Sequence, residues 1–479
     1  MTLAVVPRPD ERLTPLERLE ALCDPGSIQL IRTEVRSRRM GDRAQAGDGV
    51  LAAGGRVDGR PVFAYAQDAA FVGGSLGAAH ADSVVQVMRL AGRARVPLIG
   101  FVESAGARMQ EGLAALGGYG RIFAEHVALS GVVPQISVIC GASAGGGSYG
   151  PALTDFVITT PRASMFLTGP AVVKEVMGED VTAEQLGGPR VHARNGVATL
   201  HAPTEADAAL LVRDLLDHLP QHAGESPQRW PVVAAPGHLP DRAVPRDERK
   251  VYDVADVIRA IVDGGRLLEI SERWARNVHC SLARLDGRSI GVVANQPRHL
   301  GGVMDADAAT KAARFVRLCD LFGLPLVVLV DTPGFLPGAA QERYGVIRHG
   351  AKLVHAFAAA SVPRVTVVLR KAFGGAYIAM NAKDLGADAT FAWPGAQLGV
   401  MGAAQAVGIT HRRDIAAGAS REALAAAYRD EHLGSARAAA DGFIDEVIAP
   451  SQTRERLAAT LRLLDGAQRP AGRARNTPL

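Results

Sequence analysis

Short apolar runs alternate with longer amphipathic segments along the chain. Leu98–Val102 and Ile136–Cys140 are largely apolar runs of strand length, typical of buried strands. The patterns of His80–Arg93 and Gly120–Ser130 predict helices. The second half repeats the alternation, with predicted elements at Asp307–Phe322, Leu326–Val330, Arg348–Ser361 and Val365–Leu369. Strands that alternate with helices predict βαβ units, so we expect an α/β fold with mainly parallel strands.

An internal duplication explains why the two halves are alike. The tripeptide Asp58–Arg60 recurs as Asp286–Arg288, an offset of 228 residues, and further landmarks keep this offset. After one inserted residue, Ala144–Gly146 corresponds to Phe373–Gly375 at an offset of 229. Because chance matches would not hold one register over so many landmarks, the sequence predicts one fold used twice.

A proline-rich stretch separates the two copies. Residues 220–250 contain six prolines among polar residues, which is typical of a linker: Pro220, Pro227, Pro231, Pro236, Pro240 and Pro245. At 479 residues the chain has room for two or three domains of ordinary size. The duplication selects two, and we expect them at residues 1–235 and 245–479.

The amino-acid composition excludes or disfavours several classes of protein. The hydrophobic content of 48% is too high for a disordered chain. The four cysteines lie far apart without a CxxC pair, which disfavours a zinc site or a disulfide framework. No signal peptide and no apolar run of 18 residues is visible, so we expect a cytoplasmic location and no membrane span. Net charge is only +4 and aromatic content 5%, without basic clusters interleaved with aromatics, so we expect no nucleic-acid partner.

A glycine-rich segment follows the predicted strand that ends at Cys140, and two familiar motifs match inside it. Gly141–Gly145 fits the nucleophile elbow of α/β-hydrolases, and Gly145–Gly150 fits the dinucleotide-binding fingerprint. In the second copy, however, Ala372 stands where the elbow has Ser143. The dinucleotide motif also needs an acidic residue about 20 positions further on, and residues 156–174 contain none. Both interpretations are therefore disfavoured.

Both copies retain a pair of glycines after the strand. Glycine between a strand and a helix leaves N–H groups free, and two such groups can stabilise an oxyanion. One donor of this kind contributes about 3–4 kcal/mol to catalysis. The alternative is a tight strand–helix contact that needs no side chain. Since each pair accompanies a second strand-end glycine, Gly106 or Gly334, the sequence favours the oxyanion hypothesis.

Acid–base candidates are few. Glu103 and Asp331 occupy equivalent strand ends and could be catalytic carboxylates, helix caps or loop anchors. The histidines show no metal-ligand spacing. The chemistry therefore lacks an obvious protein base, and a cofactor could accept the proton instead.

These residues, in this order, resemble the carboxyltransferase β subunits of biotin-dependent acyl-CoA carboxylases, with propionyl-CoA and actinobacterial acyl-CoA carboxylases closest in pattern. The resemblance runs from about Leu13 to Leu464, nearly the whole chain. Its landmarks are Leu22–Ser27, Gly47–Val50, Gly73–His80, Ser104–Gly112, Ser130–Ser137, Ala294–Pro297, Lys311–Phe315, Asp331–Gly338, Arg348–Lys352, Phe373–Tyr377 and Trp393–Pro394. Together these motifs are highly specific.

The resemblance implies two tandem domains of the crotonase (ClpP/crotonase) type and a hexamer built from dimers. It implies an enzyme that moves CO2 from carboxybiotin to the α-carbon of a short acyl-CoA, acetyl, propionyl or longer, giving a malonyl-type CoA. The acyl-CoA would bind mainly to the first domain and carboxybiotin to the second domain of the dimer partner. Biotin would be carried by a separate protein that works with a biotin carboxylase, and no metal is expected in this subunit.

The resemblance also implies roles for individual residues. Backbone N–H groups among Gly145, Gly146 and Gly147 would bind the thioester oxygen, and those of Gly375 and Ala376 the ureido oxygen of biotin. The implied substrate-binding residues are Gly106, Ala107, Arg108, Gly334, Phe335, Tyr377 and Ile378.

Some positions depart from the family pattern. Glu103 stands where the family usually has Asp, and Ala105 where it has Gly. Ile378 replaces the Asp of propionyl-preferring members, which suggests altered acyl choice.

Three alternatives stay open: a decarboxylase of malonyl- or methylmalonyl-type CoA, a crotonase-type hydratase or hydrolase with Glu103 as base, and an inactive scaffold subunit.

Overall fold

The computed structural model describes residues 12–237, 240–245 and 247–467. The chain divides into two compact units, Met1–Ser226 and Pro227–Leu479, labelled unit 1 and unit 2 below. The division falls within the proline-rich stretch 220–250. Part of this stretch packs onto unit 2, because the Trp230 N–H donates to the Gly287 carbonyl (2.8 Å) and the Val233 carbonyl accepts from Arg454 (3.2 Å). That part is not a free linker.

Unit 1 is built on a mixed sheet with the strand order β1-β2-β3-β4-β5-β6-β8. The first three strands pair antiparallel and the others parallel, and the short β7 pairs with the end of β5. The strands are β1 Gln29–Ile31, β2 Val50–Val57, β3 Arg60–Gln67, β4 Leu98–Ser104, β5 Gln135–Ala144, β6 Phe156–Thr159, β7 Ser164–Phe166 and β8 Leu200–His201.

Unit 2 repeats this topology, with the order β9-β10-β11-β12-β13-β14-β16 and a short β15 on β13. Parallel and antiparallel pairs fall at the same places as in unit 1. The strands are β9 Leu267–Glu269, β10 Val278–Leu285, β11 Arg288–Asn295, β12 Leu326–Thr332, β13 Arg364–Phe373, β14 Ala389–Ala392, β15 Gln397–Gly399 and β16 Glu446–Val447. The predicted fold class, a duplicated α/β domain with parallel-rich sheets, is confirmed.

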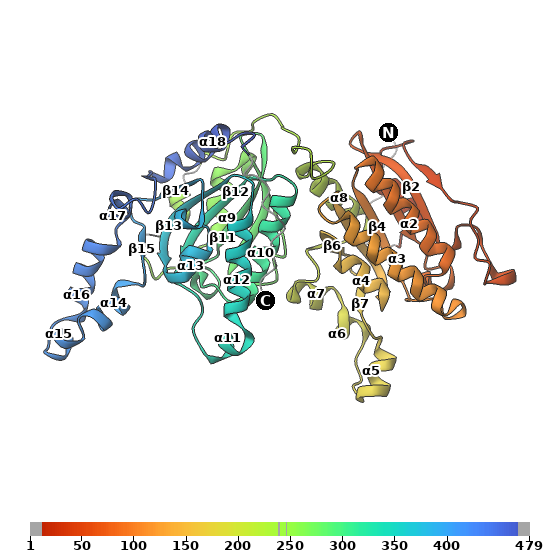
Figure 1. The fold of residues 1–479 in the computed structure, drawn as a ribbon, viewed down its shortest axis with the longest axis horizontal. Coiled ribbons are helices and arrows are strands. Elements are labelled where there is room, and N and C mark those ends of the chain that lie inside the picture. Colours follow the sequence, from red (N-terminus) through yellow and green to blue (C-terminus); the bar gives the residue numbers. More distant parts are fainter. Residues whose placement is uncertain (1–11, 238–239, 246, 468–479) are drawn as a thin grey trace. The chain divides into compact units, whose positions relative to one another are not determined.

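Helices pack against each sheet, and several short helices extend away from it (Figure 1). In unit 1 they are α1 Pro15–Leu22, α2 Ala78–Ala94, α3 Leu113–Leu129, α4 Gly146–Ala152, α5 Pro170–Met177, α6 Ala183–Gly187, α7 Pro189–Asn195 and α8 Glu205–His218. In unit 2 they are α9 Val254–Ile261, α10 Ala306–Leu321, α11 Ala339–Tyr344, α12 Val346–Ala359, α13 Gly374–Ala379, α14 Ala403–Thr410, α15 Arg412–Ala416, α16 Arg421–Tyr428, α17 Ser435–Ala440 and α18 Thr453–Leu463. In the described part of the chain, none of these helices is both long and apolar enough to cross a membrane.

Strand β4 shows how the sheet separates two environments. Successive residues of a strand point to opposite faces. Ser104 therefore faces α3, where its hydroxyl lies 3.3 Å from that of Tyr119. Glu103 faces α1 and α8, where Arg18 and Glu205 lie. On the α3 side, the apolar faces of α2 and α3 pack on the sheet and form the core of unit 1.

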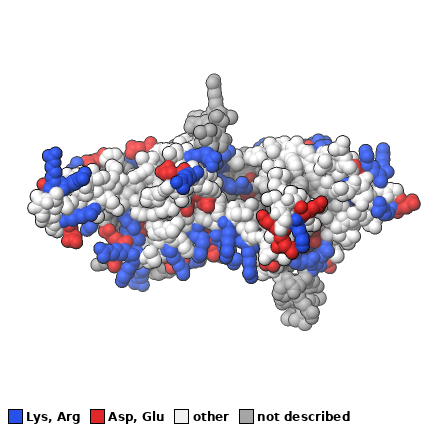
Figure 2. Space-filling model, turned by 90° about the horizontal axis from the view of Figure 1, so that it is seen from below, with Lys and Arg blue, Asp and Glu red and all other residues white. Residues whose placement is uncertain are grey.

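Surface charge is mixed. On the face shown in Figure 2, basic and acidic side chains are interspersed, in keeping with the small net charge of +4.

Candidate functional site

The turn after β5 carries the glycines predicted to donate hydrogen bonds. Gly145 forms the turn itself, with φ +55°, and its N–H donates to the Phe166 carbonyl (2.9 Å). The N–H groups of Gly146 and Gly147, which begin α4, have no acceptor among the described residues. The donors predicted in unit 1 therefore narrow from three glycines to Gly146 and Gly147.

Glycine is needed at this turn because of close packing. A Cβ atom on Gly146 would lie 2.6 Å from the ring of Tyr119, so a side chain would displace the ring or the turn. Gly147 is buried and a Cβ there would approach the Ser143 hydroxyl at 3.2 Å. The strand–helix contact considered as the alternative is thus present, and it coexists with the two free N–H groups.

The loop after β4 supplies a further free N–H beside this turn. Leu76 donates its N–H to Gly106 (2.9 Å) and accepts from the N–H of Arg108 (3.0 Å), which leaves the N–H of Ala107 pointing away from this bridge. It has no acceptor within the described residues. A Cβ on Gly106 would lie 3.3 Å from the Ala144 carbonyl, so the loop lies against the end of β5.

Unit 2 repeats the arrangement at equivalent positions. Met304 bridges Gly334 and Leu336 in the same way, which leaves the N–H of Phe335 without an acceptor in the part of the chain that is described. Gly374 forms the turn, with φ +61°, and precedes Gly375 and Ala376. Gly375 is exposed, a Cβ on it would meet no atom within 4 Å, and its N–H has no acceptor among the described residues.

The two residues after this turn differ in exposure. Burial raises the pKa of Tyr377 to about 12, so its hydroxyl stays protonated at neutral pH. Ile378 is half exposed and presents an apolar side chain one turn from Gly375. Their predicted contacts with substrate stay predictions.

Arg108 has a different setting from the one expected of a substrate-binding residue. Its guanidinium is buried and pairs with Asp48 (2.6 Å) and Glu111 (2.9 Å), and it also donates to the Ser75 carbonyl (2.9 Å). The guanidinium lies over the ring of Phe71 at 5.0 Å. In this structure the guanidinium of Arg108 anchors the loop after β4, and the predicted contact of Arg108 with substrate stays a prediction.

Ser143, the serine of the disfavoured nucleophile elbow, is fully buried. Its hydroxyl donates to the Gly147 carbonyl (2.7 Å) and thereby holds the turn of Gly145–Gly147. Among the described residues, its hydroxyl has no basic partner.

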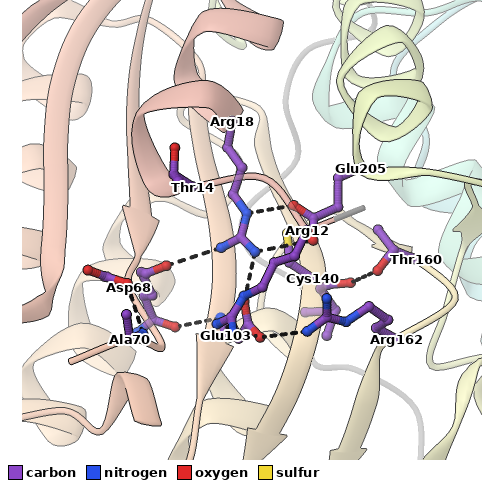
Figure 3. Close-up of polar contacts among 12 residues, drawn as sticks. Arg12, Thr14, Arg18, Asp68, Ala70, Glu103, Cys140, Thr160, Arg162 and Glu205 are labelled. Carbon is purple, nitrogen blue, oxygen red and sulfur yellow. Dashed lines mark hydrogen bonds and ion pairs between the residues drawn. The ribbon is translucent and has the colours of Figure 1, made fainter. Parts of the chain in front are cut away.

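Glu103 lies at the centre of an ion-pair cluster (Figure 3). Its carboxylate accepts from Arg18 (2.7 Å) and lies 3.0 Å from Arg12 and 3.9 Å from Arg162. Arg18 also pairs with Glu205 (2.7 Å). Because this cluster occupies the face of the sheet opposite Tyr119 and Gly146, the structure favours the loop-anchor interpretation of Glu103 over that of a catalytic base.

Asp331 has an equivalent setting in unit 2. Its buried carboxylate accepts from the Arg370 side chain (3.0 Å), the Tyr252 hydroxyl (3.0 Å) and the N–H of Lys371 (3.2 Å). Burial raises the pKa of Asp331, and the positive charges of Arg370 and Lys371 oppose this shift. The partners Arg18 and Arg370 are not predictable from the local sequence, because nothing near an arginine marks it as the ion-pair partner of a carboxylate on another strand.

Gln67 and His80 form a buried network next to Glu103. The Gln67 side-chain carbonyl accepts from the Glu103 N–H (2.9 Å), so its amide nitrogen lies 3.2 Å from His80 Nε2. Nε2 must therefore accept, and the imidazole is neutral. Burial lowers the pKa of His80 to about 3. No cluster of three or more potential metal ligands occurs in the described ranges.

Fold and site together define a class of protein: two copies of an α/β unit of the crotonase type, each with a glycine turn whose N–H groups are free to hold an oxyanion. The sequence pattern of the carboxyl transferase domain family matches residues 7–477. The chain belongs to this family, as a carboxyltransferase β subunit of the acyl-CoA carboxylase type, and is an enzyme subunit that transfers carboxyl groups.

Named relatives cover almost the whole chain. The biotin-dependent acetyl-/propionyl-coenzyme A carboxylase beta5 subunit of Mycobacterium tuberculosis is 44% identical, over 98% of this chain and 90% of the relative. The methylmalonyl-CoA carboxyltransferase 12S subunit of Propionibacterium freudenreichii subsp. shermanii is 45% identical, over 97% and 91%. A crystal structure of transcarboxylase 12S, a hexamer with methylmalonyl-coenzyme A bound, superposes with a TM-score of 0.94 at 44% identity, covering 98% of this chain and 92% of that one.

Proposed function

We propose that the protein moves the carboxyl group of carboxybiotin to the α-carbon of a short acyl-CoA and so makes a malonyl-type CoA. The observation that carries the proposal is the duplicated glycine turn with free N–H groups, one in each unit. The reaction generates two oxyanions, one on the thioester and one on the biotin ureido group, and two equivalent sites match that need. Unit 1 binds the acyl-CoA and works with unit 2 of a partner copy, which binds the carboxybiotin of a separate carrier protein, within a dimer-built hexamer.

The residues of each unit have defined tasks in this reaction. Gly146 and Gly147, with Ala107 beside them, donate to the thioester oxygen as the α-carbon becomes an enolate. Gly375 and Ala376 donate to the ureido oxygen, and the open surface at Gly375 fits a ring delivered from outside. Carboxybiotin supplies the carboxyl group and, after its release, the acceptor for the α-proton. Preorganised donors of this kind stabilise developing charge without reorganisation.

The settings of the two strand-end carboxylates support a reaction that needs no protein base. Glu103 and Asp331 are both buried and ion-paired, so neither carboxylate is free to take a proton from a substrate. A hydratase that uses Glu103 as base would need this side chain on the face of Gly146, where it does not lie.

Two partly exposed arginines favour unit 1 as the acyl-CoA side. The side chains of Arg12 and Arg162 are 37% and 39% exposed, and each approaches Glu103 with a single nitrogen. A guanidinium has five N–H donors, so both keep donors for an anion. Arg12 also lines a cavity of about 170 Å³ together with Arg18 and Asp68. We propose that Arg12 and Arg162 bind phosphate groups of CoA, which guanidinium forks suit. The CoA would then cross the carboxyl ends of β4 and β5, from Gly146 on one face of the sheet to these arginines on the other.

The test is a panel of acyl-CoA substrates assayed with a biotinylated carrier, a biotin carboxylase, ATP and bicarbonate. Carboxylation of at least one acyl-CoA, dependent on the carrier, is the expected result. Incubation with methylmalonyl-CoA, with and without biotin, tests the reverse direction. Release of CO2 without biotin would indicate a decarboxylase, and activity that appears only when a second β subunit is added would indicate a scaffold. The partner proteins and the cytoplasmic location stay predictions.

A further inference from the structure

Both sheets contain the same irregularity immediately before the glycine turn. In unit 1, Val102 pairs with Ile139 but Ser104 pairs with Ser143, so one residue of β4 faces three residues of β5. In unit 2, β12 and β13 show the same shift, since Val330 pairs with Val368 and Thr332 with Ala372. Such a bulge disrupts the ladder and redirects the strand that carries the extra residues. Here the redirected strand leads into the turn.

The single residue facing each bulge is the strand-end carboxylate. Asp331 faces Leu369–Lys371 and accepts the N–H of Lys371 (3.2 Å) and the side chain of Arg370 (3.0 Å), both from the bulge itself. Its carboxylate therefore provides an acceptor that the interrupted ladder lacks. Gly375 lies only four residues beyond Lys371 along the same strand and turn.

Unit 1 also has a carboxylate–guanidinium pair at its bulge, but the residues that form it differ. Gly141 stands where unit 2 has Arg370, and a Cβ on Gly141 would lie 2.2 Å from Glu103 Oε1. The longer Glu103 side chain thus fills this space, and the guanidinium comes from Arg18 of α1, 85 positions away in sequence (2.7 Å). The guanidinium thus comes from a helix in unit 1 and from the bulged strand in unit 2. Both units keep a buried carboxylate–guanidinium pair at the bulge.

We propose that Glu103–Arg18 and Asp331–Arg370 are positioning pairs, which hold the two bulges so that Gly146–Gly147 and Gly375–Ala376 direct their N–H groups at the reacting oxygens. The inference rests on the proposed function, because it assigns these pairs a task in carboxyl transfer. The residues do not touch substrate. They act through the five or fewer residues of backbone that separate each bulge from the donor N–H groups. Binding geometry at such a site tolerates displacements of only about 0.5 Å.

The experiment compares Asp331→Asn with the parent enzyme in the carrier-dependent assay. Asn keeps the shape of Asp but loses its charge, so the pair with Arg370 is weakened. The expected result is a turnover number 10- to 100-fold lower, with KM for acyl-CoA within twofold of the parent value. Asp441→Asn, which removes a partner of the exposed Arg437 in unit 2, is the matched control and leaves both constants unchanged.

A second set of variants keeps the test informative if Asp331→Asn folds poorly. Arg370→Lys retains the charge but not the fork, and it should lower turnover at least fivefold. The transplant Asp331→Glu with Arg370→Gly and Val257→Arg is designed to imitate the unit 1 arrangement in unit 2, because Val257 is the fourth residue of α9, as Arg18 is the fourth residue of α1. The turnover number of this triple variant should be at least tenfold higher than that of the double variant Asp331→Glu with Arg370→Gly.

The outcomes separate this inference from the proposed function. If the parent enzyme carboxylates no acyl-CoA, the proposed function fails. If the parent is active, while folded Asp331→Asn and Arg370→Lys proteins keep its turnover, the positioning role is wrong. Equal loss in turnover and in affinity for acyl-CoA would also overturn it, because a general loosening of the fold would then account for the effect.

Discussion

Gly375 allows the oxyanion role to be tested with a matched pair of substitutions. Its N–H has no acceptor among the described residues, and a Cβ there meets no atom within 4 Å. Gly375→Ala therefore adds a methyl group without a clash and keeps the donor. Gly375→Pro removes the donor, while proline is well tolerated in the first turn of a helix such as α13. The two variants thus differ mainly in one N–H group.

The expected loss of turnover follows from the contribution of a single N–H donor to transition-state stabilisation. Loss of one oxyanion-hole N–H costs about 3–4 kcal/mol of transition-state stabilisation, which corresponds to a 10²- to 10³-fold lower turnover. We expect Gly375→Pro to lose at least two orders of magnitude and Gly375→Ala less than about tenfold, since only the added methyl group hinders the substrate. The steady-state rate with a biotinylated carrier measures both. A folded Gly375→Pro enzyme with the turnover of Gly375→Ala would refute the assignment.

Three further predictions address other parts of the molecule. Because the pKa of His80 is lowered to about 3 by burial, the unfolded chain takes up a proton near pH 6.5 that the folded chain rejects. The free energy of unfolding should thus fall by about 1.4 kcal/mol per pH unit below pH 6.5, and His80→Asn should lose this part of the slope in urea unfolding at pH 7, 6 and 5. Arg162→Gln should raise KM for acyl-CoA roughly 3- to 10-fold at low salt without changing turnover, whereas Arg89→Gln should change neither; an unchanged KM would remove Arg162 from the phosphate site. Ile378→Asp should shift the ratio of kcat/KM values toward shorter acyl chains by about tenfold, and an unaltered ratio in the substrate panel would contradict the role of this side chain.

The local pattern predicted the elements well, but not all of their limits. The helix predicted at Gly120–Ser130 begins earlier in the structure, at Leu113. The prediction starts too late because three glycines in the first half of the helix weaken the helical pattern of the sequence. In the structure one of these glycines serves packing: a Cβ on Gly118 would lie 2.7 Å from the Ala81 side chain of α2. The close contact of two helices outweighs the intrinsic cost of glycine, and this contact is not visible in a local window of sequence.

The candidate site was predicted in part for the same reason. The glycines at the ends of β5 and β13 could be named, because the duplication places them at matching offsets. The sequence does not show which N–H groups of the turn are free. That depends on β7, because the Phe166 carbonyl accepts the N–H of Gly145. The sequence allows Glu103 to be a base or an anchor, and the fold favours the anchor because it brings Arg18, itself paired with Glu205, to the Glu103 carboxylate.

By itself, the sequence determined the duplicated α/β fold, the family and the two glycine turns. These depend on periodicity, spacing and residue identity, all of which are properties of the chain read in order. Only the tertiary structure decided the face on which each strand-end carboxylate lies, the arginine that neutralises it and the donors that remain free. A strand alternates its side chains between two faces, and which face meets a helix from a distant part of the chain is settled only when the sheet is assembled.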